Sequence, residues 1–206
     1  MQGFIISLHK VKEEDLIVTI ISRNNLETLY RFYGARHGTI NLGFKIDFET
    51  ENSAKSTIKR LKDVVHIGYK WLNDYKRLQV WQQFVALFYK HLKEAEEIES
   101  FYFDLLQKSS QEWEKQNPKR VVIESYVKLL KYEGRLHQED ICFLCSKPIF
   151  TEQKSLIRAF LPTHTECSHT PFFSKIALNE LYTNNSTLFF KDNEVDLLFE
   201  IVLLGL

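Results

Sequence analysis

The sequence has few of the residues that mark secreted, fibrous or membrane-spanning proteins. It contains 3 cysteines, 4 prolines, 7 glycines and a single methionine among 206 residues. Three cysteines are too few for a disulfide framework, which favours a reducing compartment. No stretch reaches the roughly 18 uncharged apolar residues of a membrane-spanning helix, and the start, MQGFIISLHKVKEED, becomes charged too early for a signal peptide. We therefore expect a cytoplasmic protein.

The chain also lacks net charge, with 27 basic and 27 acidic residues. Their distribution is nevertheless uneven. Residues 53–93 carry nine lysines and arginines against two acids, whereas residues 94–114 carry seven acids opposed only by Lys108. This polarity fits either a binding site for a polyanion or two solvated faces of opposite sign.

Apolar residues make up 44% of the chain and aromatic residues 14%, enough for a folded core. Short segments rich in β-branched and aromatic residues fill the first 70 positions: GFIIS, LIVTIIS, LETLYRFY, INLGFKIDFE and TIKRLKDVVHIGYK. In LETLYRFY, strict alternation places Leu29, Arg31 and Tyr33 on one face, and Tyr30 and Phe32 on the other. Several short strands in so few residues predict a small barrel, because closure removes exposed sheet edges.

Helical periodicity replaces this pattern after residue 70. Apolar residues at helical spacing predict a first helix: Leu78, Trp81, Phe84, Val85, Phe88 and Leu92. A second helix is predicted around residues 98–106, a third from Pro118 to Gly134, and a last packed helix within residues 188–206. The aromatic stripe between Trp81 and Phe103 fits the core of a helical bundle. We thus expect an α+β protein, with a barrel over residues 1–70 and a helical domain over residues 71–206.

One motif in the barrel segment is typical of a nucleic-acid contact. The sequence RFYGARHG, residues 31–38, joins arginines and aromatic rings around a glycine. Gly34 permits a positive φ or a close backbone approach, so that Arg36 projects from the end of a strand. Arg31 with Tyr33 offers a cation beside a ring, which suits phosphates and stacked bases of single-stranded DNA. The alternative is an ordinary strand end with solvated arginines.

The three cysteines form the pattern CxxC-x18-HxxC, with Cys142, Cys145, His164 and Cys167. Three sulfurs and one imidazole can surround Zn²⁺ tetrahedrally, and His169 is an alternative fourth ligand. With four protein ligands the site has no open position for a substrate, so its role is structural. We predict a zinc-binding element at about residues 142–167.

Three other interpretations of the cysteines have weaker support. A redox CxxC normally follows a strand and opens a helix, whereas this one precedes Pro148. A zinc deaminase needs an HxE element before a PCxxC, and neither is present. Buried cysteines without metal remain possible from the residues alone.

The order of motifs resembles the bacterial recombination mediator family RecO. The chain has Gly3-Phe4-Ile5-Ile6, then Glu14-Asp15-Leu16, the apolar strand 16–21 and Tyr33-Gly34-Ala35-Arg36 at compatible spacing. Leu129-Leu130, Gly134, Leu136 and the CxxC match the family's passage from its last bundle helix into a zinc-binding element, and the resemblance covers most of residues 1–170. Two positions depart from the family: Tyr33 replaces a usual lysine, and Ser146 replaces the glycine that usually follows the CxxC.

The resemblance implies an N-terminal OB-fold barrel, a helical domain with a zinc-binding element, and no catalysis. Proteins of this family bind single- and double-stranded DNA, anneal strands and act with RecR to load RecA on DNA coated by single-strand-binding protein. The expected location is then the cytoplasm, in association with the nucleoid. By motif position Arg36 is the expected DNA contact, and His37 and Lys45 join Arg31 and Tyr33 as neighbours on the predicted strands.

Two other classes of function compete with a DNA-binding mediator. One is a zinc-stabilised scaffold that binds proteins without touching DNA, which the zero net charge and the apolar C-terminal segment favour. The other, a hydrolase or transferase, lacks a P-loop, a GxSxG, an HExxH and a dinucleotide fingerprint.

Overall fold

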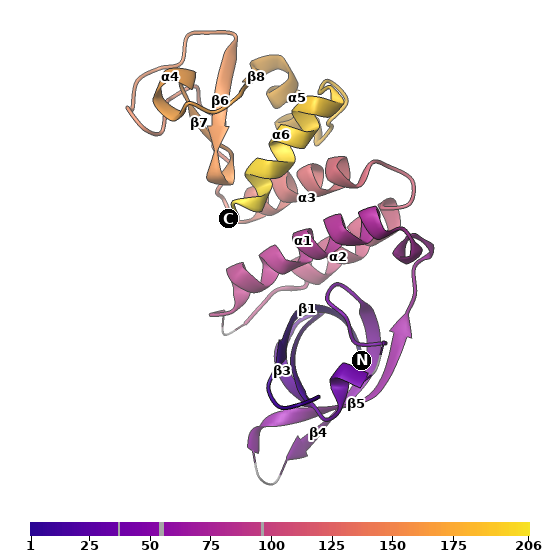
Figure 1. The fold of residues 1–206 in the computed structure, drawn as a ribbon. Helices are drawn as coiled ribbons and strands as arrows, with labels where there is room; N and C mark the ends of the chain where they lie inside the picture. The colour runs from indigo at the N-terminus through magenta and orange to yellow at the C-terminus, as the bar shows by residue number, and fades with distance from the viewer. Residues whose placement is uncertain (37, 54–55, 96) are drawn as a thin grey trace. The chain divides into compact units, whose positions relative to one another are not determined.

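The computed structural model describes residues 1–206 apart from 37, 54–55 and 96. The described chain folds into two compact units, Met1–Glu114 and Lys115–Leu206 (Figure 1). Within these residues no helix has both the length and the apolar character needed to cross a membrane.

A closed barrel forms the first part of the N-terminal unit and appears as a ring in Figure 1. Its strands are β1 (Gln2–Lys10), β2 (Leu16–Ser22), β3 (Leu26–Arg31), β4 (Lys45–Ser53) and β5 (Ser56–Ile67). They are joined in the order β1-β2-β3-β5-β4, and among the strands that the structure describes only the β3–β5 pair is parallel. The expected fold class, an OB-fold type of barrel followed by helices, is confirmed.

The barrel interior is filled by apolar side chains. Its buried members are Ile5, Leu16, Val18, Ile20, Leu29, Ile40, Ile46, Phe48 and Leu61. Burying these side chains is the main favourable contribution to the stability of the barrel. One expected strand is shorter than predicted: β4 begins at Lys45, because Gly43 takes a φ of +82° and ends a turn there.

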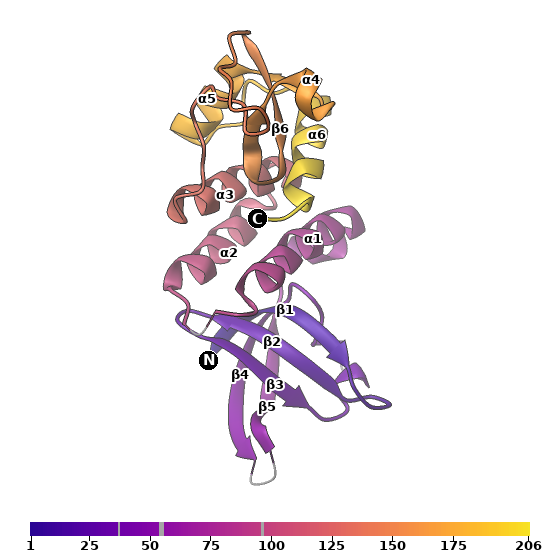
Figure 2. The same cartoon turned by 90° about the vertical axis from the view of Figure 1, so that its left-hand side faces the viewer.

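Two helices complete the N-terminal unit, as the side view in Figure 2 shows. They are α1 (Tyr75–Leu92) and α2 (Ser100–Glu112), preceded by the short 3-10 helix η2 (Lys70–Asn73). All three tryptophans meet here, with ring centroids 5.4 Å apart for Trp71–Trp81 and 4.9 Å apart for Trp81–Trp113. Phe4 of β1 packs on Trp81 at 6.0 Å. The aromatic stripe is therefore shared between helices and barrel instead of forming a bundle core.

The first compact unit extends beyond β5, which ends at Ile67, as far as Glu114. The aromatic side chains of α1 and α2 are buried together with the barrel, and this shared core accounts for the extent of the unit. The division into a barrel domain and a helical domain at residue 70 stays a prediction.

The C-terminal unit combines helices with a small sheet. Its helices are α3 (Pro118–Tyr132), α4 (Thr165–Ser168), α5 (Lys175–Asn184) and α6 (Asp192–Leu203), with η3 (Arg158–Phe160). The strands β6 (Gln153–Ile157), β7 (Leu161–Thr163) and β8 (Phe172–Ser174) form an antiparallel sheet in the order β7-β6-β8.

Helix α3 follows the sequence signals closely. Asn117 caps its first turn by accepting from Lys119 N, Pro118 opens it, and Gly134 follows its end at a φ of +65°. The apolar C-terminal segment packs against α3 as α6, and Val195, Leu198 and Phe199 are buried. The small sheet and α5 have no counterpart in the expected pattern of elements.

Candidate nucleic-acid interface and metal centre

The predicted barrel motif lies where the β1–β2 loop meets the turn after β3. Register pairs Leu16 of β2 with Arg31 of β3, which brings the loop at residues 11–15 beside the turn at residues 32–36. The backbone N–H of Ala35 donates to the carbonyl oxygen of Glu14 at 2.9 Å. This hydrogen bond therefore joins two motif segments that are distant in sequence, Glu14-Asp15-Leu16 and Tyr33-Gly34-Ala35-Arg36.

Asp15 fixes the start of this turn. Its carboxylate accepts from the backbone N–H of Tyr33 at 2.8 Å and from the hydroxyl of Tyr30 at 2.5 Å. The Tyr30 hydroxyl and then the Tyr33 N–H hold the pKa of the Asp15 carboxyl below its usual range. The same bond raises the pKa of Tyr30. Asp15 therefore stays ionised and positions the turn.

Gly34 was expected to supply either a positive φ or a close backbone approach, and the structure divides these two properties between Tyr33 and Gly34. Tyr33, not Gly34, has the positive φ, at +51°. At Gly34 the constraint is space, because a Cβ there would lie 2.9 Å from Leu16 Cδ1 and 3.0 Å from Arg31 Cγ. Tyr33 thus leaves the strand direction and does not share a strand face with Leu29, contrary to the alternation in the sequence.

Arg36 ends the short 3-10 helix η1 (Gly34–Arg36) and reaches solvent. Its side chain is 64% exposed, its Nε pairs with Glu14 Oε2, and its guanidinium lies 5.2 Å from the centroid of the Tyr33 ring. A cavity of about 620 Å³ adjoins these groups. It is lined by Lys12, Glu13, Glu14, Asp15, Phe32, Tyr33 and Arg36.

A second, neighbouring hollow extends this surface toward β5. Its volume is about 260 Å³, and Lys12, Tyr30, Phe32, Ser53, Ser56, Ile58 and Arg60 line it. Phe32 is 46% exposed and lies between Tyr30, at 4.9 Å, and the Arg60 guanidinium, at 5.1 Å from its centroid. Exposed rings beside guanidinium groups form the chemistry that stacks bases and neutralises phosphates. We name this surface, Lys12, Phe32, Tyr33, Arg36 and Arg60, the barrel rim.

The other predicted contacts differ in accessibility. Arg31 Nη1 donates to the Leu61 carbonyl at 2.9 Å, so this side chain joins β3 to β5. Lys45 is 8% exposed, and its Nζ donates to Gln107 Oε1 at 2.6 Å. Burial lowers the pKa of Lys45. Lys45 is therefore committed to the contact with α2 and is not offered to a ligand, and His37 lies outside the described residues.

The basic segment 53–93 is more neutral than its composition implies. Lys59 pairs with Glu27 at 2.9 Å, and Glu51 pairs with Lys62 at 2.7 Å and with Arg60 at 3.8 Å. Sequence reasoning missed Lys12, Phe32 and Arg60 as rim residues. Phe32 could have been found from the alternation in LETLYRFY, which places it on the other strand face from Arg31. Arg60 comes close to Phe32 only because β3 pairs with β5, which no local pattern indicates.

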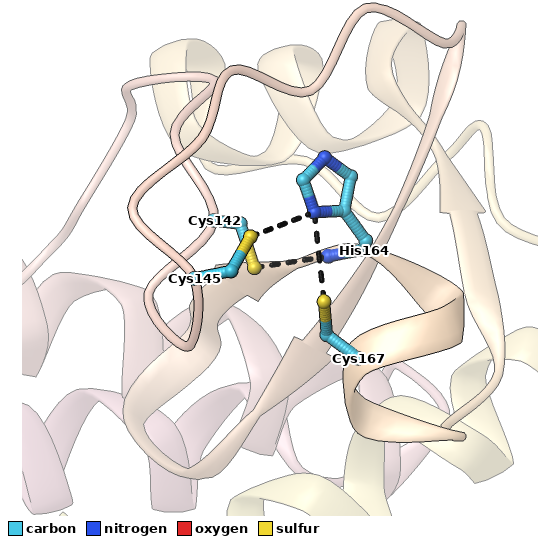
Figure 3. Close-up of side chains that lie close together, drawn as sticks. All are labelled: Cys142, Cys145, His164 and Cys167. Carbon is cyan, nitrogen blue, oxygen red and sulfur yellow. Dashed lines mark hydrogen bonds between the residues drawn. The ribbon is translucent and has the colours of Figure 1, made fainter.

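The second predicted site forms as expected from its spacing. One ligand atom from each of Cys142, Cys145, His164 and Cys167 lies within 4.8 Å of all the others (Figure 3). His164 Nδ1 is 3.4 Å from Cys145 Sγ and 3.8 Å from Cys167 Sγ. The edges of a zinc tetrahedron built from sulfur and imidazole nitrogen are about 3.6 Å. The donor set therefore fits zinc.

Local turns place these four side chains. The CxxC lies in a turn in which the backbone N–H of Ser146 donates to the Cys142 carbonyl at 2.8 Å. His164 is the residue directly before α4, and α4 carries Cys167. Ser146 has a φ of +59°, in the left-handed region that glycine adopts most readily. No helix begins at the CxxC, unlike in redox CxxC motifs.

Second-layer contacts prepare the ligands for a metal. His164 Nε2 lies 3.1 Å from the carbonyl oxygen of Pro148, which can only accept, so Nε2 carries the proton and Nδ1 faces the sulfurs. Burial raises the pKa of the Cys142 thiol, but hydrogen bonds from the backbone N–H groups of His164, Cys145 and Leu144 outweigh it and bring this pKa to about 6. His169, the alternative ligand, ends α4 in the left-handed conformation and is outside the group.

A small closed barrel of five strands is the architecture of OB-fold domains, and the rim of this one presents cations beside aromatic rings. Residues 1–72 match the family described as RecO N terminal. No curated protein matches the chain.

Proposed function

We propose that the chain binds single- and double-stranded DNA at the barrel rim and serves as a non-enzymatic recombination mediator. The observation that carries the proposal is the exposed Arg36 guanidinium set beside the rings of Tyr33 and Phe32. The arginines neutralise phosphates, and the rings stack on unpaired bases. Arg31 and Lys45 support the barrel and are left out of the contact.

Glu14 is a built-in competitor at this surface. Its carboxylate occupies Arg36 in the free protein, and Glu13 lines the same cavity. A phosphate must therefore displace the Glu14 carboxylate before it reaches the guanidinium. This ion pair is exposed, so opening it costs at most about 1 kcal/mol, a cost that several phosphate contacts readily exceed.

We expect Arg36→Ala to weaken binding of a single-stranded oligonucleotide about five- to tenfold, because one charged phosphate contact is lost. The slope of log affinity against log salt should become shallower by about 0.7, the value for one contact on a single strand. Fluorescence anisotropy at several salt concentrations measures both quantities. The melting temperature should stay unchanged, since the side chain is 64% exposed; an equal loss of stability would make Arg36 a structural residue.

Two further variants sharpen this test. Glu14→Gln frees Arg36 and should raise affinity, by up to about fivefold for a pair worth about 1 kcal/mol. Arg23→Ala removes an equal charge from the exposed turn after β2, at the far end of that strand from Leu16, and should change neither affinity nor slope. Undetectable binding by the unaltered chain in low salt would refute the proposal altogether.

We further propose that RecR is the partner with which this chain loads RecA on strands coated by single-strand-binding protein. The similarity of residues 1–72 to the RecO N-terminal family supports this role. We expect the chain to accelerate annealing of complementary coated strands, and RecA filament formation to rise only when the chain and RecR are added together. Stopped-flow fluorescence on labelled strands follows both reactions; loading that ignores RecR would argue against the partnership.

We assign the four-residue group to a structural zinc ion. Three thiols and one imidazole fill the coordination of Zn²⁺, which supplies cross-linking and not catalysis. The ion would join the CxxC turn to α4.

A scaffold function without DNA contact is the second candidate. It draws on exposed apolar side chains around the CxxC turn, where Phe143 is 58% and Phe150 88% exposed. Patches of this kind mark protein contacts. The salt-dependent DNA measurement separates the two candidates, because a scaffold would show no binding.

A further inference from the structure

A cavity of about 350 Å³ in the C-terminal unit contains none of the four metal-ligating residues. It is lined by Gln138, Asp140, Lys154, Lys175, Ile176, Asn179 and Tyr182. These side chains come from the segment before the CxxC turn, from β6 and from α5. The cavity thus lies within one compact unit and is formed by three separate stretches of the chain.

Two ammonium groups share one carboxylate in this cavity. Lys154 Nζ lies 3.1 Å from Asp140 Oδ1, and Lys175 Nζ lies 2.9 Å from Asp140 Oδ2. The side chains of the lysines are 5% and 20% exposed, whereas that of Asp140 is 48% exposed. The lining therefore carries one excess positive charge. The two lysines are more deeply buried than the aspartate that pairs with them. An uncompensated buried cation is costly unless an anion is at hand.

Donors in this cavity outnumber acceptors. An ammonium group has three N–H donors, yet among the described residues Asp140 is the only hydrogen-bond acceptor of Lys154 Nζ. Lys175 donates to Asp140 at 2.9 Å and to the Ile149 carbonyl at 2.7 Å. Tyr182 is 3% exposed, and its buried hydroxyl has no hydrogen-bond partner within the described part of the chain. Buried polar groups are rarely left without a partner.

We infer that this cavity binds a phosphate group, either as inorganic phosphate or as a phosphate monoester. The ligand oxygens accept from Lys154 and Lys175, and the Tyr182 hydroxyl donates to a third oxygen. Asn179 adds a further donor, since its Oδ1 accepts from Thr183 at 3.4 Å and its Nδ2 points to no acceptor among the described residues. This inference does not depend on DNA binding by the barrel rim.

The arrangement favours phosphate over a carboxylate. Lysine and tyrosine donors from β6 and α5 converge on the cavity from different elements, which suits the several oxygens of a tetrahedral anion better than the two coplanar oxygens of a carboxylate. Two lysines against one aspartate suit an anion of more than one negative charge. The volume of about 350 Å³ also leaves room for an organic group attached to the phosphate.

Titration of the full chain with inorganic phosphate, followed by ³¹P NMR line broadening and by calorimetry, tests the inference. We expect saturable binding with a dissociation constant of about 1 mM or tighter. Absence of saturable binding up to roughly tenfold that concentration would overturn it. The melting temperature should rise with phosphate, because a ligand of the folded state stabilises that state.

Tyr182→Phe is the discriminating variant, because it removes a hydroxyl that no described protein group binds. Phosphate affinity should fall about tenfold, the size of one hydrogen bond to a charged group, while the fold is kept. Lys175→Gln should abolish saturation, whereas Lys131→Gln, which removes an equal charge from the exposed end of α3, should leave it intact. Equal affinity in all three variants would mean that phosphate binds elsewhere, and would refute the site.

The phosphate could come from the end of a DNA strand or from a small free compound, and two oligonucleotides distinguish these sources. A 5′-phosphorylated and an unphosphorylated oligonucleotide of one sequence are compared in the Arg36→Ala background, where the barrel rim is weakened. A preference for the phosphorylated strand that Lys175→Gln removes assigns the cavity to a strand end. Equal binding of both strands, with inorganic phosphate still saturating, assigns it to a small free phosphate compound.

Discussion

Replacing Cys142 with serine should leave the purified chain without bound zinc, whereas the unaltered chain should hold about one zinc ion per molecule. Cys142 is completely buried and accepts from the backbone N–H of His164 at 3.4 Å, so this sulfur anchors both halves of the group. Structural zinc contributes on the order of 10 kcal/mol to the folding of small elements. We therefore expect residues 141–170 to lose their order in the variant.

Elemental analysis measures the zinc content, and thermal denaturation measures the loss of stability. A chelator added to the unaltered chain should lower its melting temperature in the same way. The two histidines supply the matched control: His164→Ala should lose the metal, and His169→Ala should keep it, because only His164 lies within the group. A stable unaltered chain without zinc would contradict the assignment. If the His164→Ala variant kept its zinc, His169 would be the fourth zinc ligand.

The strands of the barrel and the grouping of the three cysteines with His164 were predictable because local pattern determines both. Alternation of apolar residues specifies which side chains point inward, and Val18, Ile20 and Leu29 are indeed buried. The spacing of CxxC and HxxC similarly restricts the four ligands to two turns that one ion can join. His164 directly precedes α4. Its position at the start of the pair HxxC favoured it over His169, whose CxH spacing from Cys167 is tighter than usual for a zinc site.

The composition of the barrel rim was only partly predictable, because it depends on contacts between distant segments. Lys45 was expected on the surface, yet α2 covers it, and no pattern around Lys45 indicates Gln107 as its partner. Tyr33 leaves its strand because Asp15 holds its backbone N–H, a bond across the barrel end that alternation cannot show. Arg60 joins Phe32 through the single parallel pairing of the barrel, Tyr30 with Arg60.

The small sheet and the cavity beside it were missed for a related reason. Strands β7 and β8 are 3 residues long each, too short for a period of two to be recognised. Lys154 is buried within β6 at a position where a lysine is expected in solvent. Its environment is formed by Asp140 and Tyr182, which come from other segments.

Replacing Gly43 with alanine should strongly destabilise the N-terminal unit. Gly43 has a φ of +82°, and a Cβ at this position would lie 2.7 Å from Cδ1 and 2.8 Å from Nε1 of Trp81. Trp81 is fully buried, and its Nε1 donates to the Gly43 carbonyl at 2.7 Å, so neither partner can withdraw. Overpacking and backbone strain together should cost about 2–4 kcal/mol.

The melting temperature of this unit should therefore fall by roughly 10 °C or more, given about 4–8 °C per kcal/mol for a domain of about this size. Gly68→Ala is the matched control, because its Cβ would meet no atom within 4 Å and its φ is not positive. Zinc content should be unchanged in both variants, since the metal group lies in the other compact unit. Equal melting temperatures of the two alanine variants would mean that the backbone conformation of Gly43 and its close approach to Trp81 do not limit the stability of this unit.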